Sequence, residues 1–191
     1  RRLTGEAEDE YKGYGLRGAN ILRRGTGTDG TPVVHLLESI CKSHRLIVRS
    51  SYAAEMLAAA HNAEDAYPTI ITLQELMFGS LNPERLKNLW EQGGLQLIVT
   101  LTTDADSVYK SLSSKDLKCP TEKTLMGHVA WLRQLLDRGL IWEVQWCDTR
   151  DMTVDGHTKG SIDRALLQDV MNGKQTFTHA VKKYKPFRPK L

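Results

Sequence analysis

Alternation of apolar and polar side chains marks two strands of this chain. From 95 to 101 every second residue is apolar, and the residues concerned are Leu95, Leu97, Val99 and Leu101. A period of two predicts a strand, and the Val, Ile and Thr residues of the run 95–103 favour a pleated surface. The run 141–146 alternates in the same way. We therefore expect a core strand in each of these two segments.

Helical spacing is clearest between Thr121 and Gly139. Apolar residues there follow one another at intervals of four, three and four, as Leu125, Val129, Leu132 and Leu136. This spacing predicts a helix with one buried face. Another helix is predicted to begin at a Ser50 or Ser51 cap and to run through an alanine-rich segment, with Pro68 kinking or ending it.

The remaining elements are shorter. Helices are predicted at 70–79, 82–94, 107–112 and 161–172, where apolar residues recur at helical spacing. Strands are predicted at 14–23 and 31–39, joined by the turn-rich loop 25–30. Strands and helices thus alternate along the chain, which indicates an α/β protein.

Three acidic residues stand at the ends or entrances of these elements. Asp104 directly follows the strand 95–103, Glu55 lies in the second turn of the alanine-rich helix, and Asp155 precedes the last helix. Asp104 has an ordinary alternative role as a helix cap, and Glu55 has one as a solvated side chain on the outer helix face. If Glu55 instead packs on a sheet, its charge needs a partner or a metal ion.

The order of these segments resembles that of a known family. Residues 43–55 read Ser-His-Arg-Leu-Ile-Val-Arg-Ser-Ser-Tyr-Ala-Ala-Glu, Thr103 and Asp104 are followed by Ser107, and residues 155–159 read Asp-Gly-His-Thr-Lys. In order and spacing they resemble three motifs of the RNase H domain in copia-type LTR retrotransposon Pol polyproteins. Val154 stands where the closing motif of that family has Ala. The resemblance extends from about residue 13 to residue 173.

The resemblance implies an α/β protein with a ribonuclease H-like fold, in which a mixed five-stranded sheet is flanked by helices. It also implies that Glu55, Asp104 and Asp155 are catalytic residues and ligands of two Mg²⁺ (or Mn²⁺) ions. The fourth acid of the family is an Asp on the opening strand, whereas residues 1–12 are acidic and read as a loop. We therefore expect the opening strand and its Asp upstream of Arg1, and weak or absent cleavage without them.

The implied activity is endonucleolytic hydrolysis of the RNA strand of RNA/DNA hybrids. Hydrolysis needs an activated water and a stabilised leaving oxygen, and two divalent ions on hard carboxylate oxygens can supply both. His157, beside Asp155, is a candidate for proton transfer or product release, with an ordinary loop histidine as the alternative. Arg45, Arg49 and Lys159 are candidates for holding phosphates near the site.

Positive charge is concentrated at the C-terminal end. The chain has 26 Lys and Arg against 23 Asp and Glu, yet residues 170–191 contain six basic residues and no acidic one. We expect an RNase H-like domain over 1–173 and a basic tail over 174–191, in which Lys182, Lys183 and Lys185 interleave with aromatic residues. Such a tail can neutralise phosphates and stack on bases. Docking on a protein partner and plain solvation are the alternatives.

The composition bounds the class of protein and its compartment. A hydrophobic content of 40% over 191 residues suits one domain with a full core. No apolar run approaches the roughly 20 residues of a membrane span, and no cleavable signal is predicted at the start. Three cysteines without metal-ligand spacing favour a reducing compartment. We expect an intracellular protein, cytoplasmic or nuclear, with RNA/DNA hybrid and either a reverse transcriptase domain or a larger assembly as candidate partners.

Three functions remain open from the sequence. The first is the retroelement-derived ribonuclease H described above. The second is a repurposed RNase H-like domain with incomplete metal ligation, acting as a nucleic-acid-binding or structural component of a larger assembly, which the missing opening strand favours. The third is another nuclease or an integrase of the same fold, which the closing Asp-x-x-Thr-Lys motif disfavours.

Overall fold

The computed structural model describes residues 16–44, 48–117, 119–158 and 164–188. These residues form an α/β protein with five strands in two sheets and six α-helices. The strands are β1 Leu16–Thr26, β2 Pro32–Ser43, β3 Thr100–Thr103, β4 Glu143–Cys147 and β5 Val181–Tyr184. The α-helices are α2 Ser51–Phe78, α3 Pro83–Gln92, α4 Asp106–Ser113, α5 Met126–Asp137, α6 Asp155–Thr158 and α7 Ala165–Met171, with 3₁₀ turns at Lys123–Leu125 and Thr149–Asp151.

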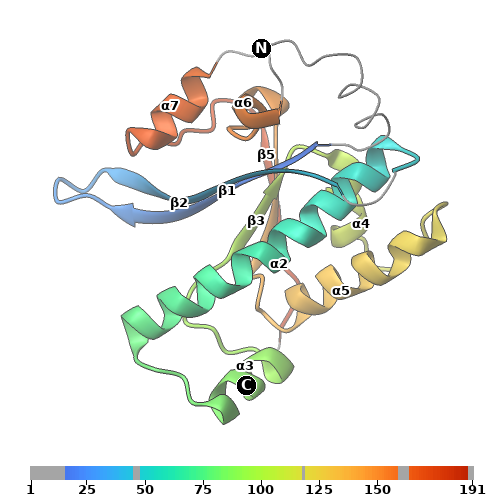
Figure 1. The fold of residues 1–191 in the computed structure, drawn as a ribbon, viewed down its shortest axis with the longest axis horizontal. Coiled ribbons are helices and arrows are strands. Elements are labelled where there is room, and N and C mark those ends of the chain that lie inside the picture. Colours follow the sequence, from blue (N-terminus) through green and yellow to red (C-terminus); the bar gives the residue numbers. More distant parts are fainter. Residues whose placement is uncertain (1–15, 45–47, 118, 159–163, 189–191) are drawn as a thin grey trace, which may run out of the picture.

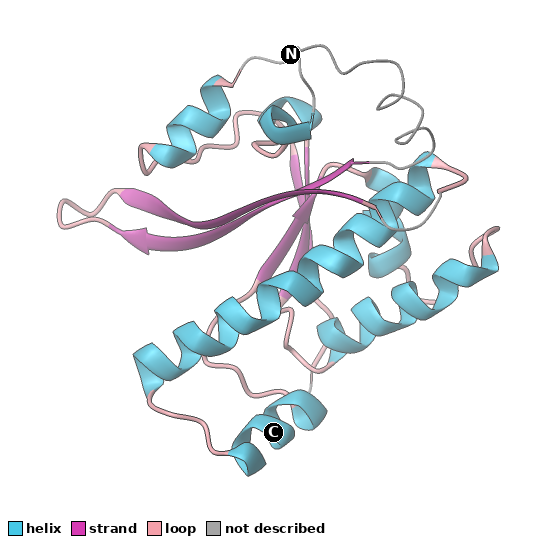
Figure 2. Ribbon diagram, viewed as in Figure 1, coloured by secondary structure: helices cyan, strands magenta, loops and turns pink. Residues whose placement is uncertain are grey.

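The strands lie in two separate sheets (Figure 2). β1 and β2 form an antiparallel hairpin whose register is shifted by a bulge after Ile21. The larger sheet has the order β3-β4-β5, with β3 parallel and β5 antiparallel to β4. The prediction of a single five-stranded sheet is therefore wrong for the described residues, because no strand among them pairs with both β1 and β3.

The strand predicted at 95–103 is shorter in the structure. Only Thr100–Thr103 pairs as a strand, although the carbonyl of Val99 already accepts a hydrogen bond from the Trp142 amide at 2.7 Å. Ile98 is 73% exposed, so the apolar run before Val99 does not form a continuous buried strand. Leu95 nonetheless packs against the core.

Helix α2 runs through the proline that was expected to interrupt it. The side chain of Ser50 caps its first turn by accepting a hydrogen bond from the Ala53 amide at 3.1 Å, which confirms one of the two predicted caps. Pro68 lies inside the helix and is exposed. A proline there removes one backbone hydrogen bond, but on an exposed face water can satisfy the carbonyl that is left, so the helix continues.

The main core lies between the larger sheet and helices α2, α4 and α5. Its fully buried side chains include Met56, Val108, Leu132, Leu136 and Val144. All four apolar residues that predicted helix α5 and the turn before it are buried. Figure 1 shows the β1–β2 hairpin running between α2 on one side and α6 and α7 on the other, with its tip beyond the core.

The segment predicted as a basic tail is part of the fold. Residues 181–184 form β5 on the outer edge of β4. Arg188 lies beyond β5, and its guanidinium donates hydrogen bonds to the carbonyls of Leu136, Ile141 and Trp142. We therefore expect removal of residues 174–191 to destabilise the domain. None of the helices in the described part of the chain could span a lipid bilayer.

Candidate functional site

Four carboxylates act electrostatically on the Cys147 thiol at the carboxyl end of β4, and we call this group the acidic edge. It consists of Asp104, Asp148, Asp151 and Asp155. Because β3 and β4 are parallel, their carboxyl ends lie side by side, and Thr103 is in register with Trp146. The indole Nε1 of Trp146 donates a hydrogen bond to the carbonyl of Asp104 at 2.7 Å, which joins the two strand ends.

The buried thiol of Cys147 lies within this group and responds to its charge. Cys147 is fully buried, and this burial raises the pKa of its thiol, with further increases from Asp104, Asp151, Asp148 and Asp155, to about 12. A thiol with so high a pKa stays protonated and is a poor nucleophile. Asp104 and Asp155, which come from separate sequence motifs, thus both act on one thiol.

Asp148 and Asp151 are held by structural partners. Asp148 accepts hydrogen bonds from the Arg150 guanidinium at 2.8 and 2.9 Å, and these bonds lower its pKa. Burial alone would raise the pKa of Asp151, but hydrogen bonds from His179 and Thr178 outweigh it and lower the pKa to about 2. Asp148 closes a local turn, whereas Asp151 anchors the segment that leads into β5.

The predicted metal ligands are divided between two places. Asp104 and Asp155 are half-buried members of the acidic edge, while Glu55 is exposed in the second turn of α2. Within residues 16–44, 48–117, 119–158 and 164–188, no group of three or more His, Cys, Asp or Glu side chains is arranged to hold a metal ion. The structure therefore brings together Asp104 and Asp155 at one edge without forming a three-carboxylate centre with Glu55.

His157 is held against the hairpin. Its Nε2 lies 2.9 Å from the side-chain oxygen of Asn20 on β1, and its carbonyl accepts a contact from the Cys41 thiol at 3.5 Å. Burial, followed by the nearby Arg164, lowers the pKa of His157. The contact with Asn20 restrains the imidazole ring of His157. Its predicted role in proton transfer stays a prediction.

The predicted phosphate-binding residues have mixed positions. Arg45 and Lys159 lie outside the described residues. Arg49 is exposed beside the cap of α2. Lys183 pairs with Glu143 at 3.4 Å.

The two other predicted cations of this segment lie over indole rings. Lys182 is 4.4 Å from the ring centre of Trp146 and Lys185 is 3.7 Å from that of Trp142. The lysines are therefore already engaged within the chain.

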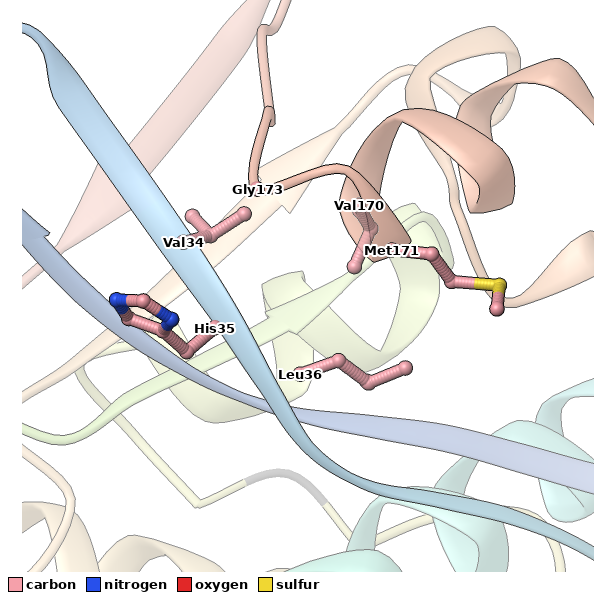
Figure 3. A pocket seen from close by; sticks show the side chains of 6 residues that line it. All are labelled: Val34, His35, Leu36, Val170, Met171 and Gly173. Carbon is pink, nitrogen blue, oxygen red and sulfur yellow. The ribbon is translucent and has the colours of Figure 1, made fainter.

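An open pocket lies between β2 and α7, as Figure 3 shows. It has a volume of about 360 Å³ and is lined by Val34, His35, Leu36, Val170, Met171 and Gly173. The amide of Val34 on β2 donates a hydrogen bond at 2.9 Å to the carbonyl of Gly173, which follows α7. None of the predicted site residues is among these six, so the pocket is separate from the acidic edge.

Comparison of the sequence with protein-family models, with curated proteins and with solved structures finds no match.

Proposed function

We propose that this chain is a ribonuclease H-like domain of retroelement origin that hydrolyses the RNA strand of RNA/DNA hybrids at the acidic edge. The observation that carries the proposal is the position of Asp104 and Asp155. They belong to two separate motifs of the resemblance, and both act on the same buried thiol of Cys147 at the carboxyl end of β4. In open α/β sheets, ligands bind outside the carboxyl ends of the strands.

The arrangement of strands is compatible with this proposal. Among the described strands, β1 pairs only with β2, and β3 pairs only with β4. Helix α2 contacts both β1 and β3. A further strand that paired with the open edges of β1 and β3 would join the two sheets into one mixed sheet. The opening strand expected from the resemblance would fill such a position.

The donors in the described residues do not make a complete magnesium centre. Carboxylate oxygens of Asp104 and Asp155 are the type of ligand that Mg²⁺ prefers, but no third ligand is arranged with them in the described residues. Further carboxylates, from Glu55 after a movement or from an opening strand, would be required. We therefore assign to Asp104 and Asp155 only the holding of negative charge at the edge where the substrate phosphate would bind.

The test is hydrolysis of a hybrid whose RNA strand carries a terminal label, in buffer with Mg²⁺ and then with Mn²⁺. We expect at most weak, metal-dependent release of RNA fragments from the wild-type chain, and less still from Asp104→Asn, because this change removes a carboxylate that attracts the metal ion. Asp116→Asn is the matched control, since Asp116 is exposed in the loop after α4. Equal activity in Asp104→Asn would refute the proposed site.

The second candidate function is a repurposed RNase H-like domain that binds nucleic acid or supports an assembly without cutting. The absence of a three-ligand group among the described residues favours this candidate. It predicts that the wild-type chain binds the hybrid in the presence of a chelator and releases no RNA fragments with either metal ion. Binding measured at two salt concentrations would give the number of phosphates contacted.

A further inference from the structure

Three histidine rings lie in a row where the hairpin meets helices α2 and α5. His44 directly follows β2, His61 is on α2 and His128 is on α5. The ring centroids of His44 and His61 are 6.1 Å apart, and those of His61 and His128 are also 6.1 Å apart. These residues come from three elements that are distant in sequence, so the row forms only when the hairpin is docked.

The surroundings of His44 disfavour a protonated ring. It is 2% exposed, and neither of its ring nitrogens has a hydrogen-bond partner among the described residues. A buried imidazole without an acceptor has nothing to stabilise the charged form. Burial lowers the pKa of His44, and His61 and Arg17 lower it further.

The other charges at this junction reinforce the effect. Arg17 on β1 is bonded to two residues of α2. Its guanidinium donates hydrogen bonds to the side-chain oxygens of Asn62 and Asp65, at 2.7 Å in each case. Lys42 on β2 also approaches Asp65, at 3.6 Å. Burial lowers the pKa of His61, as do Arg17 and His128, while Glu64 and Asp65 act in the opposite direction. Asp65 is thus already paired with Arg17 and Lys42 before any histidine is protonated.

We propose that His44 and His61, which lie in a row with His128, form a pH-sensitive latch, which holds the end of the β1–β2 hairpin on α2 and α5 when the two rings are neutral and releases it in mild acid. Leu16 pairs with Ser43 and Arg17 with Lys42, so His44 and the Arg17 anchor lie at the same end of the hairpin. Protonation places a second buried positive charge beside Arg17. Opening this end lets the new charge reach water. The proposal is independent of the proposed hydrolytic function.

The direction of the pH dependence follows from proton uptake on opening. His44 and His61 have lower pKa values in the docked state than the ordinary 6.5. The docked state is therefore fully favoured above about pH 6.5 and loses stability as the pH falls below that value. Between pH 7.5 and 5.5, each of these two imidazoles can shift the opening equilibrium by up to about tenfold.

Amide hydrogen exchange tests the latch. We expect exchange protection in 16–20 and 40–44, corrected for the intrinsic pH dependence of exchange, to fall several-fold between pH 7.5 and 5.5. His44→Phe keeps a ring of similar size without a titrating nitrogen, and its protection should fall less than that of the wild type, because one of the two imidazoles with a lowered pKa is removed. His35→Phe is the matched control, because His35 is an exposed residue of the same hairpin and should keep the wild-type response. Equal pH dependence in wild type and His44→Phe would overturn the proposal.

A second measurement applies if His44→Phe does not fold. The imidazole signals of the wild-type chain can be followed by NMR between pH 8 and 5 without any substitution. Titration of His44 and His61 below their ordinary pKa, accompanied by shifts in the amides of 16–20, supports the latch. Titration of both rings at or above the ordinary value, or with no response in the hairpin amides, contradicts it.

Discussion

Replacement of Arg188 by alanine should cost much more stability than its place near the C-terminal end suggests. Its guanidinium donates to the carbonyl of Leu136 from Nε at 3.0 Å, and Nη2 donates to Leu136 as well as to Ile141 at 3.1 Å and Trp142 at 3.0 Å. The guanidinium also lies 4.7 Å from the ring centre of Trp142. One side chain therefore joins the end of α5 to the entry of β4.

The magnitude follows from these contacts. A hydrogen bond to a charged group contributes about 1.5–3 kcal/mol, and a cation over an aromatic ring about 0.5–2 kcal/mol. The bonds share one side chain and are not additive, and water partly replaces them in the variant. We therefore expect Arg188→Ala to lower the free energy of unfolding by about 3 kcal/mol. For a chain of this size, the melting temperature should fall by about 6–12 °C.

Urea unfolding followed by tryptophan fluorescence provides the assay, because Trp142 itself lies under the guanidinium. Arg188→Lys keeps a positive charge but loses the planar fork, so its loss should be about half as large. Lys183→Ala is the matched control in the same segment, because the Lys183–Glu143 pair is largely exposed at the lysine, which is 55% exposed, and should change stability by less than about 1 kcal/mol. Arg188→Ala within about 0.5 kcal/mol of wild type would refute the reasoning.

Two further predictions concern backbone and charge. A methyl group at Gly93, where φ is +80°, would lie 1.8 Å from the carbonyl oxygen of Arg138. Gly93→Ala should therefore lower the free energy of unfolding by more than about 2 kcal/mol in the same urea titration. Gly30 has a φ of +82° and open space around it, so Gly30→Ala should lower it by only about 1 kcal/mol. Asp151→Asn should lower stability at pH 7 by about 1–3 kcal/mol, because it weakens the anchor on His179. The pKa of Asp151 is about 2 in the folded chain against 3.8 ordinarily, so wild-type stability should decline between about pH 4 and pH 2. The Asn variant should lack this part of the decline. An equal dependence of stability on pH in the two proteins would show that Asp151 is not the titrating anchor.

Elements with strong local periodicity could be predicted from the sequence. The apolar spacing of Leu125, Val129, Leu132 and Leu136 identified the buried face of α5, and Ser50 was one of two predicted caps of α2. Local spacing shows which side of a helix is apolar, and that side is expected to be buried whatever the rest of the fold. The helix through Pro68 was predicted less well, because exposure of the proline decides whether the helix can continue, and exposure is set by tertiary packing.

Long-range pairings could not be predicted in this way. The pairing of β5 with β4 and the anchor between Asp151 and His179 join segments that share no local pattern. The basic composition of 174–191 indicated a solvated or nucleic-acid-binding tail, yet its cations pair with Asp106 and Glu143 and lie over tryptophan rings. Composition records how many charges a segment has, but their partners are fixed by the fold.

The role of the candidate site residues stays a prediction. Asp104 directly follows β3, which is parallel to β4, and Asp104 and Asp155 both act on the Cys147 thiol at the end of β4. Glu55 was expected to join them, but it is exposed on α2 in the structure. Which face of α2 is buried depends on tertiary packing, which local sequence patterns do not specify.

Paramagnetic broadening by Mn²⁺ tests most directly whether the acidic edge is the functional site. Small additions of Mn²⁺ to ¹⁵N-labelled chain broaden the amide signals near a bound ion even when binding is weak, as expected for two carboxylates with no described third ligand. We predict selective broadening of the amides of Asp104, Cys147 and Asp155, reduced in Asp104→Asn and unchanged in Asp116→Asn. Sharp signals at these three residues, with broadening elsewhere or spread evenly over the chain, would contradict the assignment of the site.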